Sequence, residues 1–257
     1  MRVISLCPSN TEIIAYLGLE GLLVGVDDFS DWPESIQKLP RLGPDLSINL
    51  DLVEELKPDL VLASLSVPGM EKNVEGLKKR GIPHIVLNPQ SFEDIENDLA
   101  ATAAAFGFPE KGVAASSEFK NRLDTIRRAN TNRSTHPALY WEWWPKPVFT
   151  PGRINWLTEL SEAAGARNLF ADVDLASVQT DWEDVLARNP DFICIAWVGV
   201  QREKVKKSLI TNRPGWGDLD AVKKGRILIL EEELYCRPSP RLLEGLEKLC
   251  RLLAEAE

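Results

Sequence analysis

Short apolar runs alternate with amphipathic segments through the first half of the chain. Four runs bounded by Gly, Pro or Asp predict strands, at 3–6, 23–26, 60–63 and 84–87. The segments that follow them predict helices at about 11–17, 51–56, 71–79 and 91–106, and Ser91 with Asp94 predicts a capped start for the last. Strands that alternate with helices indicate a parallel sheet with right-handed crossovers.

The second half begins with a long helical pattern over about 110–129, which the polar run 130–135 ends. A strand pattern returns at 138–141. Further helices are predicted at 155–164, 181–188, 202–209 and 240–255, and further strands at 192–196 and 227–230. Ser239 as the cap and Pro240 in the first position predict the start of the last helix.

The two halves share an order of elements. Residues 56–62 and 188–194 each contain a helix end, a Pro-Asp pair and a buried strand, and in each half a helix and a Gly-led strand follow. We therefore predict an α/β fold of two lobes, each a mainly parallel sheet with flanking helices, joined by one long helix, with the ligand cleft between the lobes. The predicted parts are an N-terminal lobe at 1–108, a connecting helix and linker at 109–137, and a C-terminal lobe at 138–257.

Composition narrows the class of protein. The chain has 257 residues, of which 44% are hydrophobic and 27% charged, which is typical of a soluble globular protein. A net charge of −9 argues against nucleic acid or an anionic membrane as the main partner. Met1 and Arg2 lead directly into the first strand without the pattern of a signal peptide. We therefore expect a protein that stays in the cytoplasm, or one that was supplied without its export signal.

The sequence contains none of the common catalytic signatures. It lacks G-x-S-x-G, a Walker lysine loop, H-E-x-x-H and G-x-G-x-x-G. Its two histidines, His84 in a strand and His136 in the linker, are too few to favour a site for a bare transition metal. We expect no catalytic residue and no metal site.

The four cysteines show no metal-ligand spacing. Cys194 and Cys250 are expected to be buried thiols. Cys7 and Cys236 lie near predicted loops, where a disulfide between them or a ligand role stays open.

Four of the eight tryptophans fall in the segment 140–156, which three prolines interrupt. Such a run does not fit a plain core helix or a central strand. Large flat rings on an irregular segment are suited to grip a flat or bulky ligand, although a small local core or an interlobe interface would use them equally. Trp141, which ends a strand, is expected in the core, Trp143 is undecided, and Trp182 and Trp216 are expected to pack at helix starts.

Five motifs carry a resemblance to a known family. They are 2–12 (RVISLCPSNTE), 31–33 (DWP), 57–61 (KPDLV), 149–152 (FTPG) and 237–241 (RPSPR). In this order and spacing the chain resembles the helical-backbone (class III) substrate-binding proteins of ABC importers, the family that binds cobalamin and ferric siderophores. The nearest branch is the cobalamin-binding one, and the segment 143–156 is similar to that of a subgroup without a signal peptide.

The resemblance implies a two-lobed cleft with small lobe motion and a glutamate on each lobe that meets arginines of the permease. Glu71 lies twelve residues after Asp59, and Glu203 lies twelve after Asp191. Each would open the helix after its strand, where a carboxylate also favours the helix dipole. Docking on a permease and simple capping on a solvated face both remain open.

Our leading hypothesis is a non-enzymatic, monomeric binding protein for a corrinoid, which is its ligand rather than a catalytic cofactor. The predicted ligand contacts are Asn10, Trp32, Arg41, Trp144, Phe149, Arg153, Trp156, Trp197, Tyr235 and Arg237. A ferric-siderophore or haem binder is the alternative within the family. A cytosolic enzyme or corrinoid-handling chaperone on the same scaffold is the alternative of another class, and a docking subunit whose cleft is filled by its own side chains is a third.

Overall fold

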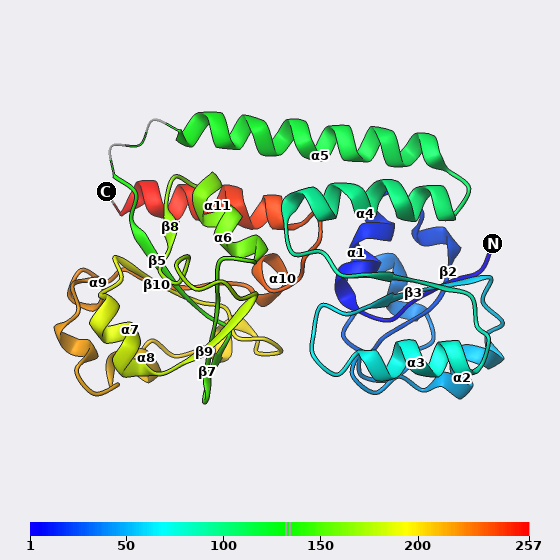
Figure 1. The fold of residues 1–257 in the computed structure, drawn as a ribbon, viewed down its shortest axis with the longest axis horizontal. Coiled ribbons are helices and arrows are strands. Elements are labelled where there is room, and N and C mark those ends of the chain that lie inside the picture. The colour runs from blue at the N-terminus through cyan, green and yellow to red at the C-terminus, as the bar shows by residue number, and fades with distance from the viewer. Residues whose placement is uncertain (132, 134, 257) are drawn as a thin grey trace. The chain divides into compact units, whose positions relative to one another are not determined.

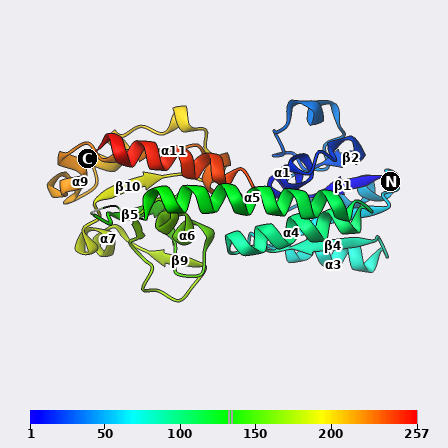
Figure 2. The ribbon, with the colours of Figure 1, turned by 90° about the horizontal axis from the view of Figure 1, so that it is seen from above.

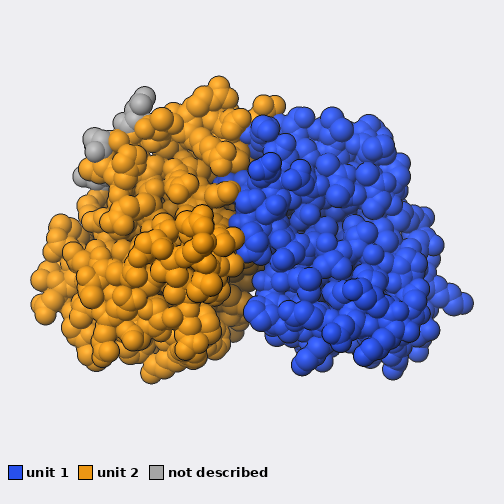
Figure 3. Space-filling model, viewed as in Figure 1, with its two compact units in different colours: residues 1–120, 238–240 blue, residues 121–237, 241–257 orange. Residues whose placement is uncertain are grey.

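The computed structural model describes residues 1–131, 133 and 135–256. It divides into two compact units, unit 1 with residues 1–120 and 238–240, and unit 2 with residues 121–237 and 241–257 (Figure 3). Asn132 and Ser134, in the polar run expected to end the long helix, lie outside the described residues. No helix in the described part of the chain combines the length and the apolar character that crossing a membrane requires.

Unit 1 is built on a parallel sheet with the strand order β2-β1-β3-β4. The strands are β1 (Val3–Ser5), β2 (Leu23–Val26), β3 (Leu60–Ser64) and β4 (His84–Leu87). The helices are α1 (Pro8–Tyr16), α2 (Leu50–Glu55), α3 (Glu71–Lys79) and α4 (Phe92–Ala105), with 3-10 turns η1 (Glu20–Leu22) and η2 (Glu34–Lys38) (Figure 1). Helices α1 and α4 pack together, and apolar residues of β1 and β3 form the core.

Unit 2 repeats this plan with the parallel order β11-β10-β5-β8. Its strands are β5 (Ala138–Glu142), β8 (Arg167–Asn168), β10 (Phe192–Ile195) and β11 (Ile227–Ile229). Its helices are α6 (Trp156–Ala163), α7 (Trp182–Arg188), α8 (Ser208–Thr211), α9 (Asp220–Lys223), α10 (Glu232–Tyr235) and α11 (Leu242–Glu255), with 3-10 turns η3 (Arg202–Lys204) and η4 (Trp216–Asp218). Helix α11 packs against α6 and α10 (Figure 1). Helix α5 (Pro109–Asn130) is one continuous helix (Figure 2) that begins in unit 1 and ends in unit 2.

The predicted α/β class and the repeat are confirmed at the level of single atoms. Lys57 and Asn189, the residues before each Pro-Asp pair, both adopt left-handed backbone, with φ of 47° and 50°. Asp59 then accepts a hydrogen bond from the backbone N–H of Arg2, and Asp191 accepts one from Ala138, at 2.6 and 2.7 Å. In each unit the repeated aspartate therefore ties the buried strand to the start of its central neighbour.

A small antiparallel sheet was not predicted. Its order is β6 (Trp144–Pro145), β7 (Val148–Pro151) and β9 (Ser177–Thr180). The strand predicted at 138–141 is confirmed as β5, which extends one residue further, to Glu142. The prolines of the segment 140–156 fall in the β6–β7 hairpin.

Two predicted helix starts are also wrong. The segment 202–209 forms the turn η3 and the short helix α8, because four cations in six residues repel one another at helical spacing. Helix α11 begins at Leu242 with Arg241 as its cap. Ser239, the expected cap, instead donates its hydroxyl to the buried carboxylate of Glu12. The capping box of Ser91 and Asp94 on α4 is confirmed.

Candidate ligand-binding site

An aromatic layer lies behind the end of β5 in unit 2. Trp141 is fully buried, donates its indole N–H to Ser161 Oγ at 2.9 Å, and has its ring 5.5 Å from that of Tyr235. Trp143 stacks on Trp156 with 5.8 Å between ring centroids and 28° between planes. The core position of Trp141 is confirmed, and Trp143 is half-buried against a buried partner.

Trp156 and Tyr235, two predicted ligand contacts, are buried in this layer. The indole N–H of Trp156 donates to the carbonyl of Tyr235 at 2.9 Å, and the hydroxyl of Tyr235 donates to the carbonyl of Gly245 at 2.8 Å. Burial raises the pKa of Tyr235, so its hydroxyl stays a donor. The indole N–H of Trp143 is buried without an acceptor in the described part of the chain. Contact of Trp156 and Tyr235 with a ligand stays a prediction.

The β6–β7 hairpin exposes a tryptophan beside a phenylalanine. Trp144 pairs with Phe149 across the two strands and is 44% exposed, whereas Phe149 is half-buried. The indole N–H of Trp144 donates to the carbonyl of Lys146 at 3.0 Å, within its own turn. This arrangement leaves part of an apolar ring accessible on a short, proline-containing hairpin.

Trp197 follows β10 and is half-buried. Its indole N–H donates to Glu142 Oε1 at 2.9 Å, at the end of β5. The next residue, Val198, donates its backbone N–H to the carbonyl of Trp143 at 3.1 Å. Trp197 and Trp144 therefore sit on adjoining segments at the carboxyl ends of β10 and β5, where parallel sheets commonly bind ligands.

The two predicted arginines of unit 2 occupy different environments. Arg153 is exposed and forms an ion pair with Asp174. Arg237 is buried and pairs with Glu232 at 3.1 Å. Between the aromatic hairpin and Arg153, Gly152 has no room for a side chain, since a Cβ there would lie 2.3 Å from the carbonyl oxygen of Leu175. This contact fixes the backbone that carries Arg153.

Of the three predicted contacts in unit 1, Asn10 lies in α1, which follows β1, whereas Trp32 and Arg41 lie in the segment that follows β2. Asn10 is buried and donates its amide to the carbonyl of Ala63 at 3.0 Å. Arg41 donates to the carbonyls of Asp27, at 3.1 Å, and Ser30, and Trp32 is half-buried on the same loop. The polar groups of Asn10 and Arg41 thus hold backbone in this structure, and their ligand roles stay predictions.

The two predicted docking glutamates differ in their local structure. Glu71 is exposed, opens α3, and accepts from the backbone N–H of Gly69 at 2.7 Å. Glu203 is exposed within η3, so the prediction that it opens a full helix is wrong. Docking itself stays a prediction for both.

The four cysteines are free thiols, so the structure contains no Cys7–Cys236 disulfide. Burial raises the pKa of Cys7 to about 12 and also raises that of Cys194, which leaves both thiols protonated. Cys194 is buried as predicted, whereas Cys250 is only half-buried.

His84 was expected in a strand, and no metal site was expected. His84 contacts the carbonyl of Ile82 through Nδ1 at 2.8 Å, as expected for a hydrogen-bonded strand histidine. The described residues contain no cluster of three or more metal-ligating side chains.

The charged network beneath Trp197 was missed by sequence reasoning. Glu142 and Arg213 form a buried ion pair, with two bonds of 2.7 Å. The one available signal was a glutamate at the end of an otherwise apolar strand, ALYWE. Its partner lies 71 residues away, between the predicted helix at 202–209 and the predicted strand at 227–230.

Comparison with known proteins identifies a family with this architecture. The family model described as "Periplasmic binding protein" matches residues 3–234. The chain belongs to this family. The periplasmic binding protein relatives include a Bacillus subtilis ABC transporter substrate-binding lipoprotein, 32% identical over 96% of this chain and 78% of the relative. A vitamin B12-binding protein of Yersinia pestis is 30% identical over 98% of this chain and 86% of the relative.

Solved structures of the family agree with the fold. The periplasmic vitamin B12 binding protein BtuF of Vibrio cholerae matches with a TM-score of 0.81 and 27% identity, covering 99% of this chain and 97% of that one. A periplasmic heme binding protein of Pseudomonas aeruginosa matches with a TM-score of 0.83 and 26% identity, covering 97% and 91%. These relatives are binding proteins rather than enzymes, which supports a non-enzymatic role at the level of the family.

Proposed function

We propose that this protein captures a corrinoid and presents it to the permease of an ABC importer. The partly exposed side chain of Trp197, at the carboxyl end of β10, is the observation that carries the proposal. The vitamin B12-binding names of the Yersinia and Vibrio relatives support the corrinoid as the ligand class.

The chemistry of the residues fits a large, flat ligand with polar edges. In unit 2, Trp197, Trp144 and Phe149 supply apolar ring surface, and Arg153 supplies hydrogen-bond donors. The proposed ligand set also contains Trp156, Tyr235 and Arg237 in unit 2 and Asn10, Trp32 and Arg41 in unit 1. Amide and phosphate groups at the edge of a corrinoid would accept hydrogen bonds from the arginine and asparagine side chains. The expected cleft between the lobes stays a prediction.

Glu71 and Glu203 are proposed to dock on arginines of the permease. Both side chains are exposed carboxylates, as an ion-pair contact with a partner requires. Glu203 has four cationic neighbours, in sequence or in the surface groove that it lines, namely Arg202, Lys204, Lys207 and Lys248. A permease arginine would meet mutual repulsion there, so the proposal is better supported for Glu71.

A haem ligand is the second candidate, because the Pseudomonas relative is a heme binding protein of similar identity. Haem carries two carboxylates, which would favour contact with Arg153 and Arg237. A ferric siderophore would make the same demand on these arginines. The family relationship also favours action outside the cytoplasmic membrane, and fractionation of the native host would locate the protein.

Titration with each ligand class tests the proposal. We expect saturable quenching of tryptophan fluorescence by cyanocobalamin and cobinamide, at concentrations where haemin and ferric siderophores leave it unchanged after inner-filter correction. The Trp197→Phe variant, which keeps an aromatic ring, should bind more weakly. Quenching by haemin alone would transfer the assignment to haem, and no response to any of these ligands would contradict both.

A further inference from the structure

A single carboxylate at the end of the central strand of unit 2 gathers three side chains. Glu142 is fully buried and accepts four hydrogen bonds. Oε1 accepts from Trp197 Nε1 at 2.9 Å and from Arg213 Nη2 at 2.7 Å. Oε2 accepts from Tyr140 Oη at 2.5 Å and from Arg213 Nη1 at 2.7 Å. Each oxygen therefore has two donors, which fixes the orientation of the carboxylate.

The partners of Glu142 are themselves held in place. The Arg213 guanidinium lies 4.6 Å from the ring centroid of Trp182 and 4.4 Å from that of Trp216. Burial, and then the charge of Glu142, raises the pKa of Tyr140, so its hydroxyl remains a donor. Two rings and a bidentate ion pair thus hold Arg213, and through it the acceptor that Trp197 uses.

The position of the Trp197 indole follows from this network. Its polar N–H faces inward to Glu142, while the side chain as a whole packs against the core of unit 2 and stays partly exposed. Trp144 offers the contrast, since its N–H binds a carbonyl of its own exposed turn. The side chains of Trp197 and Arg213, at the two ends of the segment 197–213, both bind the buried carboxylate of Glu142.

We propose that Glu142 is a positioning residue, which with Arg213 fixes the Trp197 indole in its ligand-facing orientation before a ligand arrives. The inference rests on the proposed function, because it gives Trp197 the role of a ligand contact. An indole that is already ordered loses less conformational entropy when a flat ligand stacks on it. Without the network, we expect the affinity for cobalamin to fall about 3- to 10-fold.

The test uses a variant in which the network is replaced by apolar groups of similar size. This apolar variant carries Tyr140→Phe, Glu142→Met and Arg213→Met, so that neither a buried charge nor a buried hydroxyl is left without a partner. It is combined with Trp197→Phe in a double-mutant cycle, with cyanocobalamin affinity as the readout. We expect the apolar variant to lose affinity when Trp197 is present, and to change it less than about 1.5-fold when Trp197 is already Phe.

A second readout needs no ligand. The hydrogen exchange of the Trp197 indole N–H is followed by NMR, with the signal assigned by its loss in Trp197→Phe. We expect slow exchange in the unmodified protein, and in the apolar variant exchange as fast as that of Trp144.

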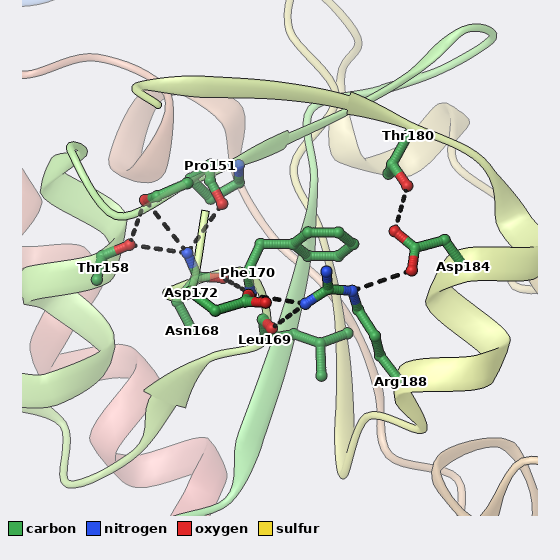
Figure 4. A network of polar contacts seen from close by, with 10 residues as sticks. Pro151, Thr158, Asn168, Leu169, Phe170, Asp172, Thr180, Asp184 and Arg188 are labelled. Carbon is green, nitrogen blue, oxygen red and sulfur yellow. Dashed lines mark hydrogen bonds and ion pairs between the residues drawn. The ribbon is translucent and has the colours of Figure 1, made fainter. Parts of the chain in front are cut away.

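Arg188 provides the control, because it is another arginine of unit 2 with carboxylate and ring partners. It binds Asp172 at 2.7 Å and Asp184 at 3.1 Å, and its guanidinium lies 4.2 Å from the centroid of the Phe170 ring (Figure 4). Arg188→Met should lower stability while leaving the exchange of Trp197 unchanged.

The outcomes separate the two proposals. Equal loss of cobalamin affinity in both Trp197 backgrounds, or an unchanged affinity, would overturn the positioning role while leaving the proposed function intact. Failure of the unmodified protein to bind any ligand would contradict the proposed function. Indole exchange would then decide the positioning role by itself, and unchanged protection in the apolar variant would overturn it.

Discussion

Removing Arg213 alone should destabilise unit 2 severely. The ion pair of Glu142 and Arg213 is almost completely dry, with side-chain exposures of 0% and 2%. Arg213→Met leaves the Glu142 carboxylate buried with only Tyr140 and Trp197 as donors. Breaking a buried pair from one side costs about 3–5 kcal/mol, because an uncompensated charge remains in a site of low dielectric constant.

The apolar variant defined above is the matched comparison. It removes both charges together, and such replacements are often neutral, so we expect its free energy of unfolding within about 1–2 kcal/mol of the unmodified protein. The assay is urea unfolding followed by far-ultraviolet circular dichroism, which does not depend on the tryptophans that surround Arg213. A loss of less than about 1 kcal/mol in Arg213→Met would contradict this expectation, because the Glu142 carboxylate would then be hydrated or neutralised at little cost.

Three further predictions concern other parts of the chain. Gly152→Ala should destabilise unit 2 by about 1–3 kcal/mol, because its Cβ would lie 2.3 Å from the carbonyl oxygen of Leu175; an unchanged urea midpoint would contradict this close contact. Burial raises the pKa of Asp98 to about 7, so its protonation favours the folded state, and this contribution is lost as pH rises from about 4 to about 7. Asp98→Asn should therefore stabilise the protein at pH 8 but not at pH 3.5, and an equal effect at both values would be inconsistent with that shift. A thiol reagent applied at pH 8 without reductant should react with all four cysteines of the denatured protein. In the folded protein it should spare the buried thiols of Cys7 and Cys194. If only two thiols react after denaturation, the other two form a disulfide, which would contradict the structure.

The fold was predictable from sequence where local signals and topology agree. The Pro-Asp pairs at 58–59 and 190–191 mark the entry of equivalent strands, and the structure shows that their aspartates make equivalent hydrogen bonds. The capping box of Ser91 and Asp94 is likewise a contact between neighbours in sequence, which a short motif is sufficient to predict.

Two of the features that sequence did not predict depend on contacts between distant residues. Ser239 has the chemistry of a helix cap, but the carboxylate of Glu12, 227 residues away, binds its hydroxyl. The Pro-Asp pairs mark where two strands begin, but no sequence pattern links Glu142 to Arg213, which lie 71 residues apart. Such partners are set by packing in three dimensions, which hydrophobic periodicity does not encode.

The candidate site shows the same division. Strand ends could be located from sequence, and Trp197 lies just after β10, close to the predicted strand end at 196, whereas Trp144 begins the unpredicted strand β6. How deeply each side chain is buried could not be predicted from sequence, because burial depends on which elements cover that side chain. Trp156 and Tyr235 thus share the aromatic character of Trp197 but pack into the layer behind β5.

Calorimetric titration of the purified protein with cyanocobalamin measures corrinoid binding itself. We expect saturable binding of one corrinoid per chain, weakened at least about tenfold in Trp197→Ala, where a ligand-stacking ring is removed. Absence of binding heat across several temperatures, or binding that Trp197→Ala leaves unchanged, would contradict this prediction.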